Sequence, residues 1–140
     1  MSAPPEQLAM VRQWIEKAES DYRNFQNTLK MGEDCPFDTV CFHAQQCAEK
    51  YLKARLVYLS IDFPKIHDIS EIIRLFPPGF GIPLTPAEQT KLTRFAWMGR
   101  YPGNWEPMNR QDAEEAAALA VKVRTAIRAS FPKGVLAGIP

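Results

Sequence analysis

The fold of this chain is decided by the stretch CFHAQQCAEKYLKA, which occupies residues 41–54. Placed at about 100° per residue, residues 40–59 form an amphipathic helix with an unusually wide apolar face. That face comprises Val40, Cys41, Ala44, Cys47, Ala48, Tyr51, Leu52, Tyr58 and Leu59. The opposite side carries His43, Gln46, Glu49, Lys50 and Lys53. Because its apolar face is so broad, we expect this helix at the centre of a bundle, or packed against a second subunit as well.

Helix signals continue on both sides of this stretch. Apolar residues recur every three or four positions between Leu8 and Leu29, which predicts a first helix over residues 4–30 that opens with Pro4 and Pro5. Asp38 is the expected N-cap of the central helix, which should end near residue 59.

Three more helices are expected downstream. The third begins near His67 or Asp68 and ends before Pro77. Thr85 as N-cap and Pro86 as first residue predict a fourth helix to about residue 98, and the last spans about 111–130. The sequence therefore predicts an all-α fold, an antiparallel up-and-down helical bundle of four to five helices. We expect one domain over residues 1–131 and a loosely structured C-terminal tail over 132–140.

Composition excludes several classes of protein. The chain has 140 residues and a formal net charge of +1, so its overall field does not favour nucleic acid. It contains no apolar run of the ~20 residues that cross a bilayer, and its N-terminus does not resemble a signal peptide. Two histidines and three scattered cysteines match no zinc spacing, and no glycine-rich phosphate loop is present. We therefore expect a cytoplasmic protein with reduced thiols, no membrane contact, no metal and no cofactor.

Arg55 is the exception on the apolar face of the central helix. A guanidinium cannot be buried without partners, so Arg55 requires carboxylates, carbonyls or a bound anion. Asp21 on the first helix is a candidate partner. Two interpretations stay open at this stage: a structural ion pair or snorkelling side chain, and a contact to an anion such as phosphate.

The polar side of the central helix and the end of the fourth helix are the other candidate sites. His43, Gln46, Lys50 and Lys53 form one strip, which is either a phosphate contact or an ordinary solvated face. Near the end of the fourth helix, Arg100 and Tyr101 combine a cation with an aromatic ring. Such a pair can stack a base and neutralise phosphate, or can simply anchor the loop.

The residues 41–54 quoted above resemble the signature helix of the HEPN family, the "higher eukaryotes and prokaryotes nucleotide-binding" domains. Three further segments are similar to that family: residues 18–22, the His67-Asp68-Ile69 start of the third helix, and Arg100-Tyr101-Pro102. The resemblance extends from about residue 14 to residue 131. It implies a helical bundle that commonly forms homodimers and often accompanies a minimal nucleotidyltransferase in a toxin–antitoxin-like pair.

Many HEPN proteins are metal-independent ribonucleases in which four to six residues separate an arginine from a following histidine. This chain departs from that pattern, because neither His43 nor His67 has such an arginine. We therefore expect no catalytic residues and a non-catalytic module that binds a nucleotide, RNA or protein partner. Two alternatives stay open: a ribonuclease toxin with non-standard catalytic residues, and a purely structural dimeric adaptor. The expected ligand contacts are Lys50, Lys53, Arg55, Arg100 and Tyr101, with His43 and His67 as further candidates.

Overall fold

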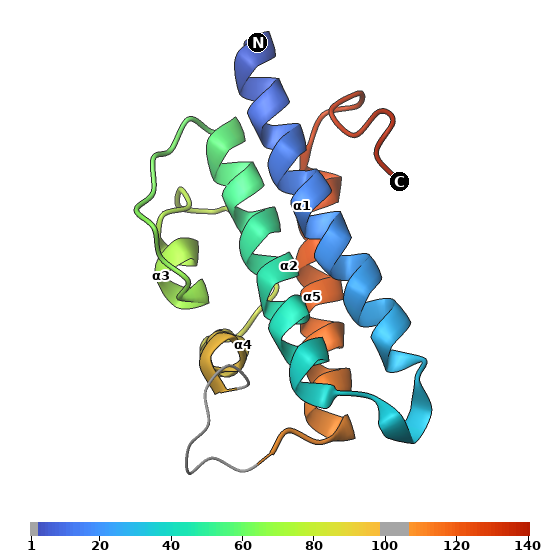
Figure 1. Cartoon of the computed structure of the whole chain (residues 1–140). Helices are drawn as coiled ribbons and strands as arrows, with labels where there is room; N and C mark the ends of the chain where they lie inside the picture. Colours follow the sequence, from blue (N-terminus) through green and yellow to red (C-terminus); the bar gives the residue numbers. More distant parts are fainter. Residues whose placement is uncertain (1–2, 99–106) are drawn as a thin grey trace.

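The computed structural model describes residues 3–98 and 107–140, and these form a bundle of α-helices (Figure 1). The helices are α1 (Pro5–Leu29), α2 (Phe37–Tyr58), α3 (Ile69–Arg74), α4 (Pro86–Met98) and α5 (Arg110–Ser130), with a short 3-10 helix, η1 (Gly32–Asp34), before α2. No strand occurs in the described residues. The predicted all-α helical bundle is confirmed.

The short helices α3 and α4 set the relative directions of the three long helices. α1 runs antiparallel to α2, whereas α2 and α5 run the same way because α3 and α4 return the chain between them (Figure 1). Accordingly, Arg110 at the start of α5 lies over the ring of Phe37 at the start of α2, at 5.1 Å from its centroid. At the other end, Arg55 Nη1 donates to the carbonyl of Ser130 at 3.1 Å.

Local capping explains where most helices begin. Pro5 occupies the first turn of α1, and Asp68 caps α3 by accepting from the Glu71 N–H. Thr85 and Glu88 bond reciprocally at the start of α4, as the sequence predicts for a Thr-Pro entry. The expected Asp38 cap of α2 is wrong. Pro36 stands at that position, the helix begins at Phe37, and the Asp38 carboxylate accepts the neighbouring Thr39 N–H instead.

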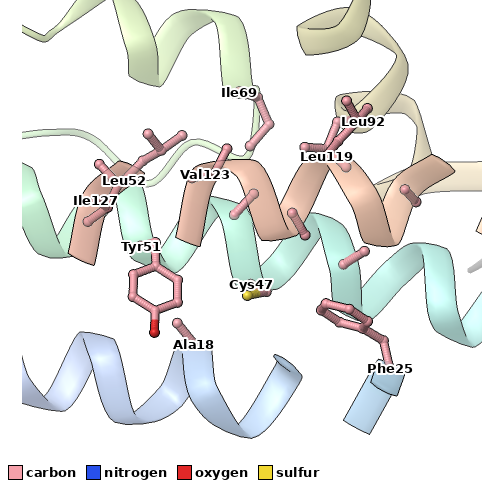
Figure 2. Close-up of a cluster of buried hydrophobic side chains, with 14 of the residues drawn as sticks. Ala18, Phe25, Cys47, Tyr51, Leu52, Ile69, Leu92, Leu119, Val123 and Ile127 are labelled. Carbon is pink, nitrogen blue, oxygen red and sulfur yellow. The ribbon is translucent and has the colours of Figure 1, made fainter. Parts of the chain in front are cut away.

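The core is built around α2, which contacts each of the other four α-helices. Figure 2 shows Cys47 and Tyr51 of α2 on the side of Ala18 and Phe25 of α1, and Leu52 of α2 beside Ile127 of α5. Small alanines on α5 let that helix approach closely; Ala113, Ala116 and Ala120 are fully buried. The three cysteines are buried and unbridged, as the sequence predicts. None of the described helices is long and apolar enough to cross a membrane.

The C-terminal segment 132–140 forms turns and lies against α1 near the end of the bundle where α1 begins (Figure 1). The sequence predicts a loosely structured tail here. Two contacts hold the segment: the Arg12 guanidinium donates to the carbonyls of Val135 and Ala137, at 2.7 and 2.6 Å. Ile139 is only 9% exposed. This segment therefore helps to shape the surface beside α1 and the end of α2.

Candidate functional site

The polar side of α2 carries two clusters, each with one carboxylate, one histidine and one lysine. In the first cluster, Asp21 of α1 lies between His43 and Lys50. Its Oδ1 is 2.7 Å from His43 Nδ1, and its Oδ2 accepts from Lys50 Nζ at 2.6 Å. The three side chains are 10–25% exposed. A carboxylate on Nδ1 orients an imidazole and favours the tautomer whose Nε2 accepts a proton.

The second cluster lies one turn along α2, beneath the chain that connects α2 to α3. Lys53 Nζ donates to Glu49 Oε2 at 3.1 Å and to the carbonyl of Ile66 at 2.8 Å. The Glu49 carboxylate also contacts His67 Nδ1 at 3.0 Å, and Gln45 donates to Glu49 and to the His67 carbonyl. Lys53 further lies over the rings of Trp14 and Phe63, at 5.7 and 5.5 Å.

Both lysines of the predicted polar strip, Lys50 and Lys53, are paired with carboxylates, and Lys53 is also covered. The side chains of Lys53 and Glu49 are 5% and 4% exposed, so this part of the strip is not the solvated face that was one of its two interpretations. The chain between α2 and α3 covers it. Each lysine of the strip faces a carboxylate, so its charge is already neutralised within the protein. A phosphate would have to displace Asp21 or Glu49 to bind Lys50 or Lys53.

Arg55 lies on a different side of α2, among aromatic rings. Its guanidinium carbon is 4.9, 5.2 and 5.4 Å from the ring centroids of Tyr58, Phe80 and Phe131. Its Nη1 donates to the Ser130 carbonyl, and Asp21, the candidate partner, is bonded to His43 and Lys50 instead. No carboxylate of the described residues pairs with Arg55. The candidate partner Asp21 is therefore not paired with Arg55.

The hydrogen-bonding capacity of Arg55 is mostly unused. Its Nε is buried and has no acceptor among the described residues, and Nη2 has none either. Burial lowers the pKa of the Arg55 guanidinium below its ordinary value, although the guanidinium stays charged. We call Arg55 and the three rings around it the Arg55 site. It offers one uncompensated cation and aromatic faces, which is the combination that holds an anion attached to a flat or apolar group.

A third charged cluster joins α1, α2 and α5, and no pattern in the sequence predicts it. Arg124 grips the Glu19 carboxylate with Nε at 2.7 Å and Nη2 at 2.9 Å. The Tyr51 hydroxyl donates to the same carboxylate, and Arg128 donates to Tyr51 at 3.1 Å. Burial alone would raise the pKa of Glu19, but bonds from Arg124 and Tyr51 and the two arginine charges outweigh it and lower that pKa. Glu19 is saturated with donors, so this cluster is structural.

The predicted site residues thus do not form one site. His43 and Lys50 share Asp21, Lys53 and His67 share Glu49, and Arg55 stands apart on another side of the helix. Arg100 and Tyr101 lie outside the described residues. Within the part of the chain that the structure describes, no group of histidine, cysteine and acidic side chains is arranged to hold a metal ion.

The rings of the Arg55 site illustrate what sequence reasoning misses. Tyr58 follows Arg55 by three residues on α2, so helical spacing alone places it beside the guanidinium. Phe80 comes from the connection between α3 and α4, and Phe131 from the end of α5. No local pattern links those two residues to Arg55, and only the folded bundle brings them together.

Comparison with known proteins agrees with this fold. The chain is similar to the crystal structure of TT1696 from Thermus thermophilus, with a TM-score of 0.74 and 27% identity over 86% of this chain and 98% of that one. It also shares its fold with ST0689, an archaeal HEPN homologue, with a TM-score of 0.61 and 23% identity over 85% of this chain and 95% of that one. No curated protein matches its sequence. The model of the HEPN domain matches residues 11–130, and the chain therefore belongs to the HEPN domain family.

Proposed function

We propose that this protein is a non-catalytic HEPN binding module of the cytoplasm whose ligand is a nucleotide held by its phosphate at Arg55. The observation that carries this proposal is the uncompensated charge of the Arg55 site. Of the predicted cations that the structure describes, Lys50 and Lys53 each already have a carboxylate, whereas Arg55 has none. An incoming phosphate gains a full charge-assisted hydrogen bond at Arg55 without displacing a protein group.

The aromatic surroundings of Arg55 favour a nucleotide over a free phosphate. Tyr58 and Phe80 are half-buried, so each keeps part of its side chain in contact with solvent. An aromatic face stacks a base with little sequence preference and contributes about 1–3 kcal/mol per base. The two groups would therefore recognise different ends of a nucleotide: the guanidinium contacts the charged phosphate, and an aromatic ring stacks on the flat base.

The proposed partners rest on the family resemblance. They are a second copy of this chain and a minimal nucleotidyltransferase in a toxin–antitoxin-like pair. Size-exclusion chromatography with light scattering tests for the homodimer, and a mass of one chain at micromolar concentration would refute it. The pairing with a nucleotidyltransferase is tested by co-expressing this protein with one encoded beside its gene, followed by affinity purification. The absence of a stable complex would refute the pairing.

One observation favours a second candidate function, ribonuclease activity with non-standard residues. His43 is held through Nδ1 by Asp21, an arrangement that prepares its Nε2 to act as a general base. A fluorescent RNA incubated with the protein without metal ions would be cleaved, and His43→Ala would abolish the cleavage. RNA that stays intact in the presence of the wild-type protein would exclude this function.

Thermal melting against nucleoside mono-, di- and triphosphates and short RNA tests the nucleotide proposal. A ligand at about 100 times its Kd stabilises the fold by about 2.7 kcal/mol. For 140 residues this corresponds to a rise of about 9 °C in Tm, from an unfolding entropy of about 2.1 cal/mol/K per residue. Arg55→Met keeps the length and apolar volume of the side chain but removes its charge, so it should lose this rise.

Two controls separate binding from stability. Arg23→Met removes the same charge from an exposed position on α1 and should keep the ligand-induced rise. Arg55→Lys restores a charge without the planar fork and should recover only part of it. If Arg55→Met responds to nucleotides as the wild type does, the phosphate is not held at Arg55. If no nucleotide or RNA shifts the Tm of the wild type, the structural adaptor becomes the better description.

A further inference from the structure

A separate cavity lies where the C-terminal segment crosses α1 and the end of α2. Its volume is about 370 Å³, which is within the range of small-molecule sites. The lining includes Leu8 and Arg12 of α1, Tyr58 of α2, and Pro132, Lys133 and Val135 of the C-terminal segment. We call it the C-terminal cavity. Arg55 does not line it, although Tyr58 contributes to both sites.

The walls of this cavity are held in place by the fold. The Arg12 guanidinium binds two carbonyls of the C-terminal segment, at 2.7 Å to Val135 and 2.6 Å to Ala137. A turn closes between Pro132 and Val135, whose N–H donates to the Pro132 carbonyl at 3.3 Å. Gly134 has a φ of 101° in that turn, a conformation that side chains rarely adopt. The cavity is therefore formed by anchored chain on both sides.

The charged groups at this cavity are all of one sign. Arg12 and Lys133 line it, no acidic residue does, and neither cation takes part in an ion pair among the described residues. The backbone N–H groups of Lys133 and Gly134 also have no acceptor within the described chain. A cavity that combines free N–H donors and cations without an ion pair with an apolar wall suits a small molecule that has an anionic group on an apolar body.

We infer that the C-terminal cavity binds a small organic anion, with its apolar body against Leu8, Val135 and the Tyr58 ring and its carboxylate or phosphate at Lys133. This inference does not depend on the nucleotide proposal, because it concerns a different set of cations. Lys133 is the specific contact, since it is exposed and its ammonium group has no partner among the described residues. Arg12 has a supporting role, because its donors already hold the C-terminal segment.

Titration by two-dimensional amide NMR tests the inference with three small probes. The probes are 4-phenylbutyrate, phenyl phosphate, and 4-phenylbutylamine, which has a similar body but the opposite charge. The two anions should produce saturable shifts of the Lys133, Gly134 and Val135 amides, and their relative affinities show which anionic group is preferred. The amine should leave those amides unchanged. No saturable shift with either anion, or equal shifts with the amine, would overturn the inference.

Matched variants identify the contact. Lys133→Glu should weaken the better anion at least tenfold, because about 1.4 kcal/mol of charge-assisted bonding corresponds to a factor of about ten. Lys17→Glu makes the same change in net charge at an exposed position on α1 outside the cavity and should bind as the wild type does. Equal weakening in both variants would overturn the assignment to Lys133. This inference is read from the amide shifts of residues 133–135, and the nucleotide proposal from the rise in Tm, so the two can fail separately.

Discussion

Arg124→Met is the substitution that most sharply tests how the three long helices are held together. Arg124 grips the Glu19 carboxylate with two bonds of 2.7 and 2.9 Å, and the Glu19 side chain is only 4% exposed. Removing one partner of a buried pair costs about 3–5 kcal/mol, because the remaining charge is left buried. Here Tyr51 still donates to Glu19, and Arg128 lies 3.6 Å away. We therefore expect a smaller loss of about 2–3 kcal/mol in the free energy of unfolding.

The assay is urea unfolding at neutral pH followed by far-ultraviolet circular dichroism. The expected loss corresponds to a Tm lower by about 7–10 °C for a chain of this length. Arg23→Met is the control, because Arg23 is exposed and should change stability by less than about 0.5 kcal/mol. Adding Glu19→Gln to Arg124→Met should recover part of the loss, since the buried charge is then gone. If Arg124→Met is as stable as Arg23→Met, the pair does not hold the bundle as we describe.

Three further predictions concern acid, capping and thiols. Because the pKa of Glu19 is lowered in the folded state, the ionised Glu19 stabilises the fold at neutral pH, and this stabilisation is lost as the pH falls below about 4.5, the unfolded value. Glu19→Gln should therefore reduce the loss of unfolding free energy at acidic pH, measured by urea unfolding. The same loss in the variant as in the wild type would contradict this. Asn109→Ala removes the capping box of α5 and should lower the unfolding free energy by about 1 kcal/mol, whereas no measurable change would show that the cap is dispensable. Burial raises the pKa of Cys41 to about 12 and that of Cys47 as well, so both thiols should react with a disulfide reagent only after unfolding, and rapid labelling of the native protein would refute their burial.

The helices are predictable because their signals are local. Periodic apolar residues define α1, α2 and α5, and the entries at Asp68 and Thr85 depend on bonds to residues three positions away. Asp38 shows the limit even of local signals, since a helix that follows Pro36 begins two residues earlier than an N-cap at Asp38 would place it.

The pairing of charges is not predictable in the same way. Which of Arg55, His43 and Lys50 faces Asp21 depends on how α1 lies along α2, and no local pattern in the sequence sets that position. Lys53 belongs to a polar strip by spacing, yet the connection between α2 and α3, which has no periodicity, covers it. The C-terminal cavity depends on where the segment 132–140 lies, and that position follows from two bonds to Arg12. Each of these features depends on contacts between residues far apart in sequence.

The central claim is that Arg55 receives the phosphate of a nucleotide, and its own side-chain N–H reports this most directly. The Arg55 Nε–H resonance is identified in a nitrogen-15 spectrum by its loss in Arg55→Met. The nucleotide that raises the Tm most should shift this resonance along a saturable curve, because Nε has no acceptor among the described residues and its guanidinium would then face a phosphate. If the resonance stays in place while amides elsewhere in the protein titrate, the nucleotide binds at another site and the claim is wrong.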